Sequence, residues 1–260
     1  MTSVDELLAE AEAHPVVGWD FSWLGERLAS RPPPWDYEAI VERHAERAAD
    51  LLDLGTGGGH WLESLSNRPA RTVATESWQP NLEVARGRLE PLGVEVVAAP
   101  AAPDNIDQSP GLDSPPLPFG DGSFSLVVSR HESYLAAEIA RVLRPGGVFV
   151  TQQMGGDYNP YRAALGLSPV EPRVFELQLA REQLEAAGLR VLAGEEGSAT
   201  TTFADAGAFA YWLRAIPWIV DGFSVSAQRA ALAALQRRLD DEGPLTIEEP
   251  AFVLEAAKPG

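Results

Sequence analysis

The stretch ADLLDLGTGGGHWL, residues Ala49–Leu62, decides the fold. A short apolar run at 51–54 leads into glycines at 55, 57, 58 and 59, and apolar residues at helical spacing resume after His60. This pattern predicts a strand, a tight turn and a helix. Glycines allow positive φ and close approach of a ligand, while the free amides of the first helical turn point at that ligand. We therefore expect a ligand with a negative group at this turn.

The spacing of the glycines narrows the class of ligand. A dinucleotide fingerprint, G-x-G-x-x-G, would need a third glycine where His60 stands, and a Walker loop would need a Gly-Lys pair, whereas the only lysine is Lys258. What remains is D-x-G-x-G-x-G, written with Asp53, Gly55, Gly57 and Gly59. It resembles the first motif of class I S-adenosylmethionine-dependent methyltransferases.

Two further segments carry the same resemblance. The run LPFGDGSFSLVVSRHESY (Leu117–Tyr134) is similar to the P-F-x-D-x-S-F-D-x-V segment of type 11 methyltransferases, with Ser125 in place of the usual aspartate. The run AEIARVLRPGGVFV (137–150) then supplies a helix, a turn at 143–147 and a strand. The resemblance covers residues 49–154 and fades on either side.

The resemblance implies S-adenosyl-L-methionine as cofactor. Glycines 55, 57 and 59 would receive its methionine portion, and Glu76, at the end of the second strand, would accept hydrogen bonds from both ribose hydroxyls. An acidic residue that often contacts the adenine is replaced here by Pro100 or Ala101, which leaves backbone groups, or Asp104 after a shift, for that contact. The full set of implied cofactor residues is Tyr37, Asp53, Gly55, Thr56, Gly57, Gly59, Glu76, Ser77, Ala101 and Ser129.

Strands and helices alternate from residue 50 to 154, which predicts an α/β fold with a doubly wound, mostly parallel sheet. With strands expected at 189–193 and 251–256, the sheet would have seven strands, as in the Rossmann-like methyltransferase fold. The residues between those last two strands are too many for a hairpin, so we expect an inserted helical lid. The expected divisions are an N-terminal helical arm (1–48), the binding core (49–197), the lid (198–246) and the last strand with its tail (247–260).

Composition excludes several function classes. The chain of 260 residues has no cysteine, so thiolate nucleophiles and cysteine-ligated metals are absent. Its formal net charge of −18 disfavours nucleic acid and anionic membranes as partners. No basic leader or long apolar run is present, which predicts a cytoplasmic protein. No metal site is indicated, and the oligomeric state is left open.

The acceptor site is expected around the loop after the fourth strand. His131 has an imidazole suited to act as general base near neutral pH, although a structural histidine bonded to a loop carbonyl explains it equally well. Arg130 and Tyr134 would hold a polar part of the substrate. Trp19 and Phe21 in the arm and Trp212 in the lid would form an apolar wall, or would only pack these segments onto the core.

These features predict a methyltransferase that acts on O or N of a small, partly apolar metabolite. One alternative is a methyltransferase for RNA or protein, which the acidic charge disfavours. A second is a protein that binds S-adenosylmethionine or S-adenosylhomocysteine without catalysis. A third, an NAD-dependent oxidoreductase, conflicts with His60.

Overall fold

A computed structural model describes residues 2–17, 19–109 and 114–260. The chain forms two compact units, each built from three segments. Unit 1 contains Met1–Pro32, Gly156–Arg173 and Ser198–Pro250, and unit 2 contains Pro33–Gly155, Val174–Gly197 and Ala251–Gly260. Residues 33–48, expected in the arm, thus group with the core, whereas 156–173, expected in the core, group with unit 1.

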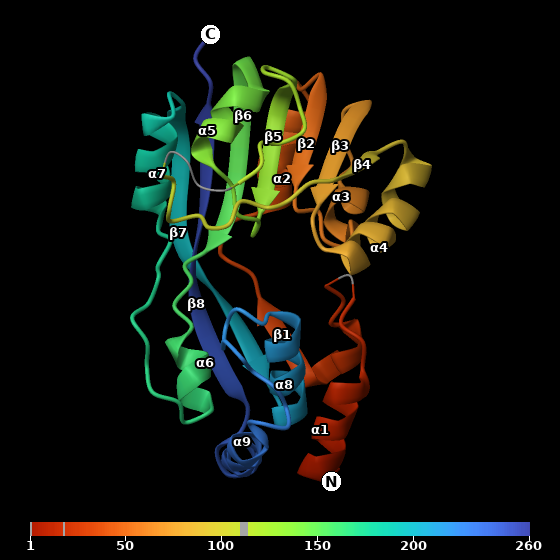
Figure 1. Cartoon of the computed structure of the whole chain (residues 1–260), viewed down its shortest axis with the longest axis vertical. Coiled ribbons are helices and arrows are strands. Elements are labelled where there is room, and N and C mark those ends of the chain that lie inside the picture. Colours follow the sequence, from red (N-terminus) through yellow and green to blue (C-terminus); the bar gives the residue numbers. More distant parts are fainter. Residues whose placement is uncertain (1, 18, 110–113) are drawn as a thin grey trace. The chain divides into compact units, whose positions relative to one another are not determined.

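Unit 2 is organised around a mixed sheet (Figure 1). The strand order across the whole sheet is β1-β7-β8-β6-β5-β2-β3-β4. The pairs β2–β3, β2–β5, β3–β4 and β5–β6 are parallel, and β8 pairs with β6 antiparallel. The strands are β1 (Leu28–Arg31), β2 (Asp50–Leu54), β3 (Arg71–Glu76), β4 (Glu95–Ala98), β5 (Phe124–Arg130), β6 (Leu143–Met154), β7 (Arg190–Phe203) and β8 (Leu245–Ala257).

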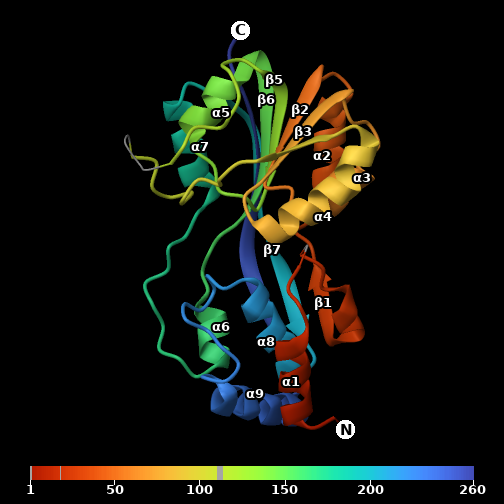
Figure 2. The same ribbon diagram turned by 45° about the vertical axis from the view of Figure 1, so that its right-hand side comes forward.

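Helices cover both faces of the unit 2 sheet, as the doubly wound expectation requires (Figure 2). Adjacent residues of β2 show why: Leu51 packs with one set of helices and Leu52 with the other, because successive strand side chains point to opposite faces. One face carries α2 (Tyr37–Ala45), α3 (His60–Ser64) and α4 (Gln79–Leu89), and the other carries α5 (Ala136–Val142) and α7 (Leu177–Ala186). The predicted strand, turn and helix around the glycines are confirmed.

Two differences from the predicted sheet have local causes. The turn expected at 143–147 lies inside β6, where the register with β5 shifts between Phe124 and Leu126; Gly146 has a φ of 78°. This irregularity lets β6 accommodate the Pro-Gly-Gly segment without ending the strand. Strand β1 brings the sheet to eight strands and was not predicted, because its residues show no alternation between buried and exposed positions. It pairs antiparallel with β7 from Leu28↔Phe203 to Arg31↔Thr200.

Unit 1 has its own apolar core. Helix α1 begins with a capping box, in which Ser3 and Glu6 bond to each other's amides. Arg27, the last residue of a 3-10 turn, bonds to the Asp205 carboxylate at 2.7 Å and to Glu10 at 2.9 Å, which joins this turn to α8 and α1. The helices are α1 (Val4–Ala13), α6 (Asn159–Ala164), α8 (Ala206–Ala215) and α9 (Arg229–Glu242), with 3-10 turns at Ser22–Arg27 in this unit and Glu90–Leu92 in unit 2.

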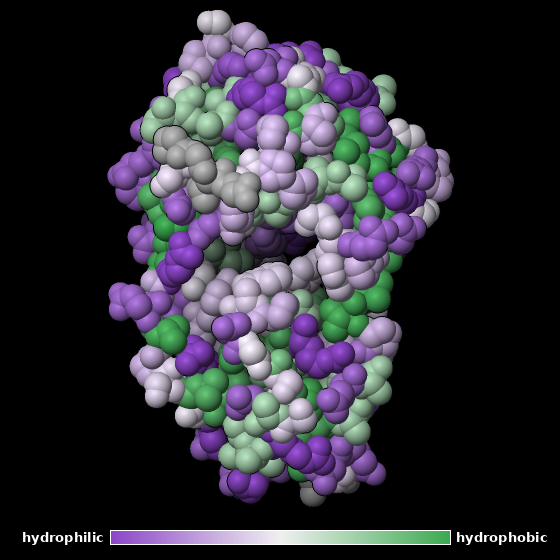
Figure 3. Space-filling view, in the orientation of Figure 1, coloured by the Kyte–Doolittle hydropathy of each residue, from purple (hydrophilic) through white to green (hydrophobic). Residues whose placement is uncertain are grey.

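Hydrophilic and apolar residues are interspersed over the face drawn in Figure 3. This distribution is expected for a chain with 22% charged residues. Within the described part of the chain, every helix is too short or too polar to traverse a lipid bilayer.

Candidate functional site

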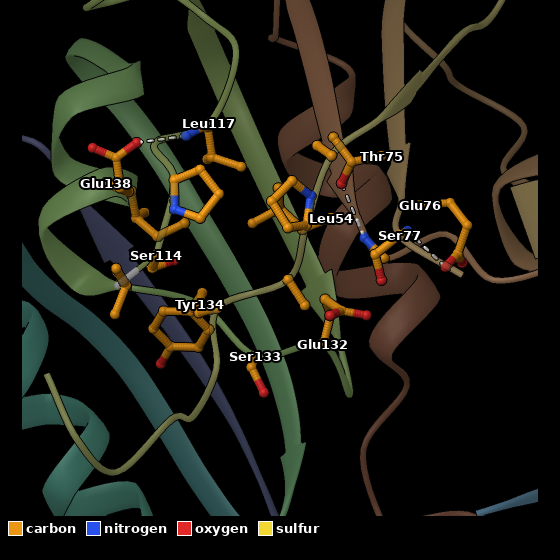
Figure 4. A pocket seen from close by; sticks show the side chains of 18 residues that line it. Leu54, Thr75, Glu76, Ser77, Ser114, Leu117, Glu132, Ser133, Tyr134 and Glu138 are labelled. Atoms are coloured by element: carbon orange, nitrogen blue, oxygen red, sulfur yellow. Dashed lines mark hydrogen bonds between the residues drawn. The ribbon is translucent and has the colours of Figure 1, made fainter. Parts of the chain in front are cut away.

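A pocket that is open to solvent lies at the carboxyl ends of the parallel strands of unit 2 (Figure 4). Ligands of doubly wound sheets bind in this position, because the loops that follow neighbouring strands converge there. Leu54 and Gly55 follow β2, Glu76 and Ser77 follow β3, and segments 99–102, 114–117 and 132–135 complete the lining together with Glu138 and Ile139. Part of the loop expected at 102–123, residues 110–113, lies outside the described residues.

The glycine turn beside this pocket has the predicted conformation. Gly55, Gly57 and Gly59 have φ values of 65°, 61° and 78°, a region that side chains with a Cβ rarely adopt. The Thr56 amide donates to the Thr75 carbonyl at 2.8 Å, which ties the turn to β3. The amides of Gly57 and Gly58 donate to no residue that the structure describes. They remain available for an anionic group of a ligand, as the sequence predicts.

Gly55 leaves space for the carboxylate of Glu132, which lies directly against it. A Cβ placed on Gly55 would lie 2.1 Å from Oε2 of Glu132, so only glycine leaves room for that side chain. Glu132 and Glu76 both line the pocket, and Figure 4 shows the two carboxylates near the end of β2. The Oε1 atom of Glu76 accepts the amides of Ser77 and Trp78, each at 2.8 Å, which fixes the carboxylate in place.

The acidic groups in the pocket and the adjacent Asp53 influence one another's pKa. Burial raises the pKa of Asp53 to about 7, and the charge of Glu76 adds to this effect. Burial also raises the pKa of Glu132 to about 7, with contributions from Glu76 and Asp53. Ionising several buried carboxyl groups close together raises the free energy of the folded protein. The site therefore favours a ligand with a positive centre.

Several buried polar atoms beside the turn lack partners. Oδ2 of Asp53, Oγ1 of Thr56 and the hydroxyl of Tyr37 make no hydrogen bond with the described residues. Buried polar groups are normally bonded, so such atoms indicate a site for a polar ligand. These atoms and the glycine cradle fit S-adenosylmethionine, which carries a carboxylate, an ammonium, a sulfonium and ribose hydroxyls.

The loop after β5 is held by polar residues of β6. The side-chain amide of Gln153 donates to the Glu132 carbonyl at 3.0 Å and to Thr151 Oγ1 at 2.9 Å. Ser129 Oγ donates to the same Glu132 carbonyl at 2.9 Å. His131 has a φ of 68°, unusual for a residue other than glycine, and its amide donates to the Gln152 carbonyl at 2.9 Å.

The structure brings some of the expected residues to one pocket and places others nearby or elsewhere. Gly55, Glu76, Ser77, Ala101 and Tyr134 line the pocket. Tyr37, Asp53, Thr56, Gly57, Gly59, Ser129, Arg130 and His131 belong to the same unit but are not among its lining residues.

Tyr134 is almost fully buried and packs edge-on against Phe149, with ring centroids 4.9 Å apart. Its hydroxyl has no partner among the described residues, and burial raises its pKa. The expected apolar wall lies in unit 1: Phe21 contacts Trp19 and Trp212 at centroid distances of 6.5 and 4.9 Å. Trp19 is 41% exposed.

Sequence reasoning missed residues whose signals were present. Glu132 directly follows the predicted site residues Arg130 and His131 in the sequence, but sequence reasoning assigned it no role. The run Thr151-Gln152-Gln153 interrupts an apolar strand with three polar residues, all buried, and such a run indicates a polar network. Asn105 and Gln108 pin the long loop to Tyr134 and Ala136 by hydrogen bonds of 3.0 and 2.8 Å.

Comparison with known proteins agrees with this geometry. Residues 52–151 match the family described as methyltransferase domain. The ubiquinone biosynthesis O-methyltransferase of Paramagnetospirillum magneticum (strain ATCC 700264 / AMB-1) is 31% identical over 124 residues, which are 46% of this chain and 45% of that enzyme. The matched segment thus spans less than half the length of that relative.

Solved structures share the fold at low identity. BH2331 of Bacillus halodurans C-125 superposes with a TM-score of 0.58 at 19% identity, covering 86% of this chain and 99% of the other. The [4+2]-cyclase SpnF gives a TM-score of 0.50 at 22% identity, covering 85% and 80%. Residues 52–151 are thus similar to a methyltransferase domain, and solved structures share the fold of the chain.

Proposed function

We propose that this protein transfers a methyl group from S-adenosylmethionine to O or N of a small, partly apolar metabolite. The observation that carries the proposal is the pocket of unit 2, where Gly55, Glu76 and Glu132 line the ends of β2, β3 and β5. Amides at the turn suit the methionine carboxylate. The carboxylates of Asp53 and Glu132 suit the positive charges of the same ligand.

Glu76 is the proposed ribose partner. Its Oε1 is occupied by two backbone amides, which hold the side chain so that Oε2 can accept from ribose hydroxyls. The backbone at 99–102 is the proposed neighbour of the adenine, because Pro100 and Ala101 carry no acidic side chain. When bound, S-adenosylmethionine supplies an electrophilic methyl group on sulfur. The protein has to align the acceptor atom with it and exclude water.

The identity of the acceptor class rests on charge. The net charge of −18 repels phosphate backbones, so a small molecule is proposed in preference to RNA. The O-methyltransferase relative is consistent with an oxygen acceptor over the matched segment. A cytoplasmic location stays a prediction. The cyclase among the structural neighbours illustrates that one fold hosts several chemistries, so activity has to be measured.

The test is ligand binding followed by transfer. S-Adenosylmethionine and S-adenosylhomocysteine should raise the melting temperature by mass action, and NAD should not. Glu76→Ala should weaken the calorimetric affinity, whereas Glu83→Ala, a control on α4 whose side chain is 65% exposed, should leave it unchanged. Identical melting curves with and without both nucleosides would refute the proposal. A metabolite library assayed with labelled methyl donor would then identify the acceptor.

A further inference from the structure

Three side chains of unit 2 form a directed chain of hydrogen bonds next to the pocket loop. The indole Nε1 of Trp35 donates to Oε1 of Gln152 at 2.7 Å. The other end of the same amide, Nε2 of Gln152, lies 3.1 Å from Nε2 of His131. Gln152 is only 4% exposed, so its amide has little access to water.

The chemistry of these groups leaves one arrangement of protons. An indole N–H can only donate, so the amide atom that faces Trp35 has to be the oxygen. The NH₂ group of Gln152 therefore faces His131, and an amide NH₂ can only donate. The Nε2 atom of His131 accepts this hydrogen bond with its lone pair. In the neutral imidazole, the proton is then on Nδ1.

The backbone holds the imidazole in this position. His131 lies in the left-handed region, and a residue with a Cβ keeps that conformation only where its surroundings enforce it. Its amide donates to the Gln152 carbonyl at 2.9 Å, and Gln153 holds the carbonyl of the next residue, Glu132, at 3.0 Å. Strand β6 thus fixes both the backbone and the ring of His131.

We infer that Trp35 and Gln152 are positioning residues that fix His131 as its Nδ1–H tautomer, so that His131 donates a hydrogen bond to the methyl acceptor and does not remove a proton from it. Residue His131 as a whole is exposed, and Nδ1 makes no hydrogen bond with any residue in the described ranges. The site therefore suits an acceptor molecule with a carbonyl, carboxylate or phenolate oxygen, next to the exposed guanidinium of Arg130. The tautomer stands on geometry alone, whereas the role toward the acceptor rests on the proposed function. This inference replaces the general base expected from the sequence.

The test is the tautomeric state of His131 in the full chain. In protein with ¹⁵N-labelled histidine, long-range proton–nitrogen correlation spectra distinguish protonated from unprotonated ring nitrogens. The chain has four histidines, and His131→Gln identifies the signals of His131 by their loss. The expected pattern is a protonated Nδ1 and an unprotonated Nε2. A wild-type spectrum with the proton on Nε2 would overturn the inference.

Variants test whether Gln152 and Trp35 cause the preference. Gln152→Leu should move the population toward Nε2–H, and Gln152→Glu should place the proton on Nε2 because a carboxylate only accepts. Trp35→Phe should give a mixture, since the amide can then rotate. The control Gln178→Leu removes an exposed glutamine on α7 that bonds to Glu182, and it should change nothing.

The signals of the other three histidines report whether each variant is folded. An unchanged tautomer in folded Gln152→Leu would refute the role of Gln152. If S-adenosylmethionine fails to bind while the Nδ1–H tautomer is present, the proposed function fails and the positioning of His131 stands. The two ideas are therefore separated by independent measurements.

Discussion

Replacing Asp53 by asparagine is expected to stabilise the ligand-free protein above neutral pH. Asp53 is 2% exposed, and its Oδ2 atom has no partner among the described residues. Burial raises its pKa from 3.8 to about 7. Asparagine has nearly the same shape as the protonated acid and never ionises, so the variant avoids placing a charge in a dry site.

The magnitude follows from the pKa of Asp53. Each pKa unit corresponds to about 1.36 kcal/mol, so the rise from 3.8 to about 7 corresponds to about 4 kcal/mol. Because the folded-state pKa is the higher one, the wild type loses this stability as pH rises from the unfolded pKa to the folded pKa. The advantage of Asp53→Asn should therefore be about 2 kcal/mol near pH 5 and about 4 kcal/mol at about pH 8.

Thermal unfolding of both proteins at these two pH values measures the effect. For a chain of this size, about 4 kcal/mol corresponds to a rise of roughly 10 °C in melting temperature. Asp121→Asn is the matched control, because that side chain is 83% exposed and should matter at neither pH. Equal melting temperatures at about pH 8, or an advantage of Asp53→Asn that grows on acidification, would refute the reasoning.

Three further predictions concern the pocket and the core of unit 1. Gly55→Ala should abolish S-adenosylmethionine binding in calorimetry and lower the melting temperature, because its Cβ would lie 2.1 Å from Glu132. The control Gly93→Ala introduces similar backbone strain at a position with open space, so it should retain binding. Affinity for S-adenosylmethionine should rise by up to about tenfold per pH unit near pH 7, because Glu132 ionises in this range. An equal rise for S-adenosylhomocysteine, which lacks the sulfonium charge, would contradict this explanation. Tyr161→Phe should destabilise the protein by about 1 to 3 kcal/mol, since the buried carboxylate of Glu249 loses a donor at 2.8 Å; unchanged thermal unfolding would show that this hydrogen bond has no net value.

Local patterns in the sequence predicted the elements that contain the glycine turn. The apolar run before Gly55 became β2, and the fifth to seventh expected strands became β6, β7 and β8. Each of these signals involves residues a few positions apart, so it can be read along the chain. The methyltransferase fold class followed from their order.

Long-range groupings could not be predicted in the same way. Strand β1 is defined only by its pairing with β7, and residues 156–173 join unit 1 through contacts with segments distant in sequence. The roles of Glu132 and Gln152 depend on partners 77 and 117 residues away, Gly55 and Trp35. Periodicity carries no information on such pairs, because it records which face is apolar and not which partner covers it.

The sequence by itself determined the order of strands and helices, the glycine cradle and the carboxylate that ends β3, since these follow from backbone preferences and apolar spacing of neighbouring residues. Only the tertiary structure decided that the carboxyl groups of Glu76 and Glu132 line one pocket and that Nε2 of His131 faces the side-chain amide of Gln152. Electrostatic repulsion and hydrogen-bond direction depend on distances between side chains, and those distances exist only once the chain has folded.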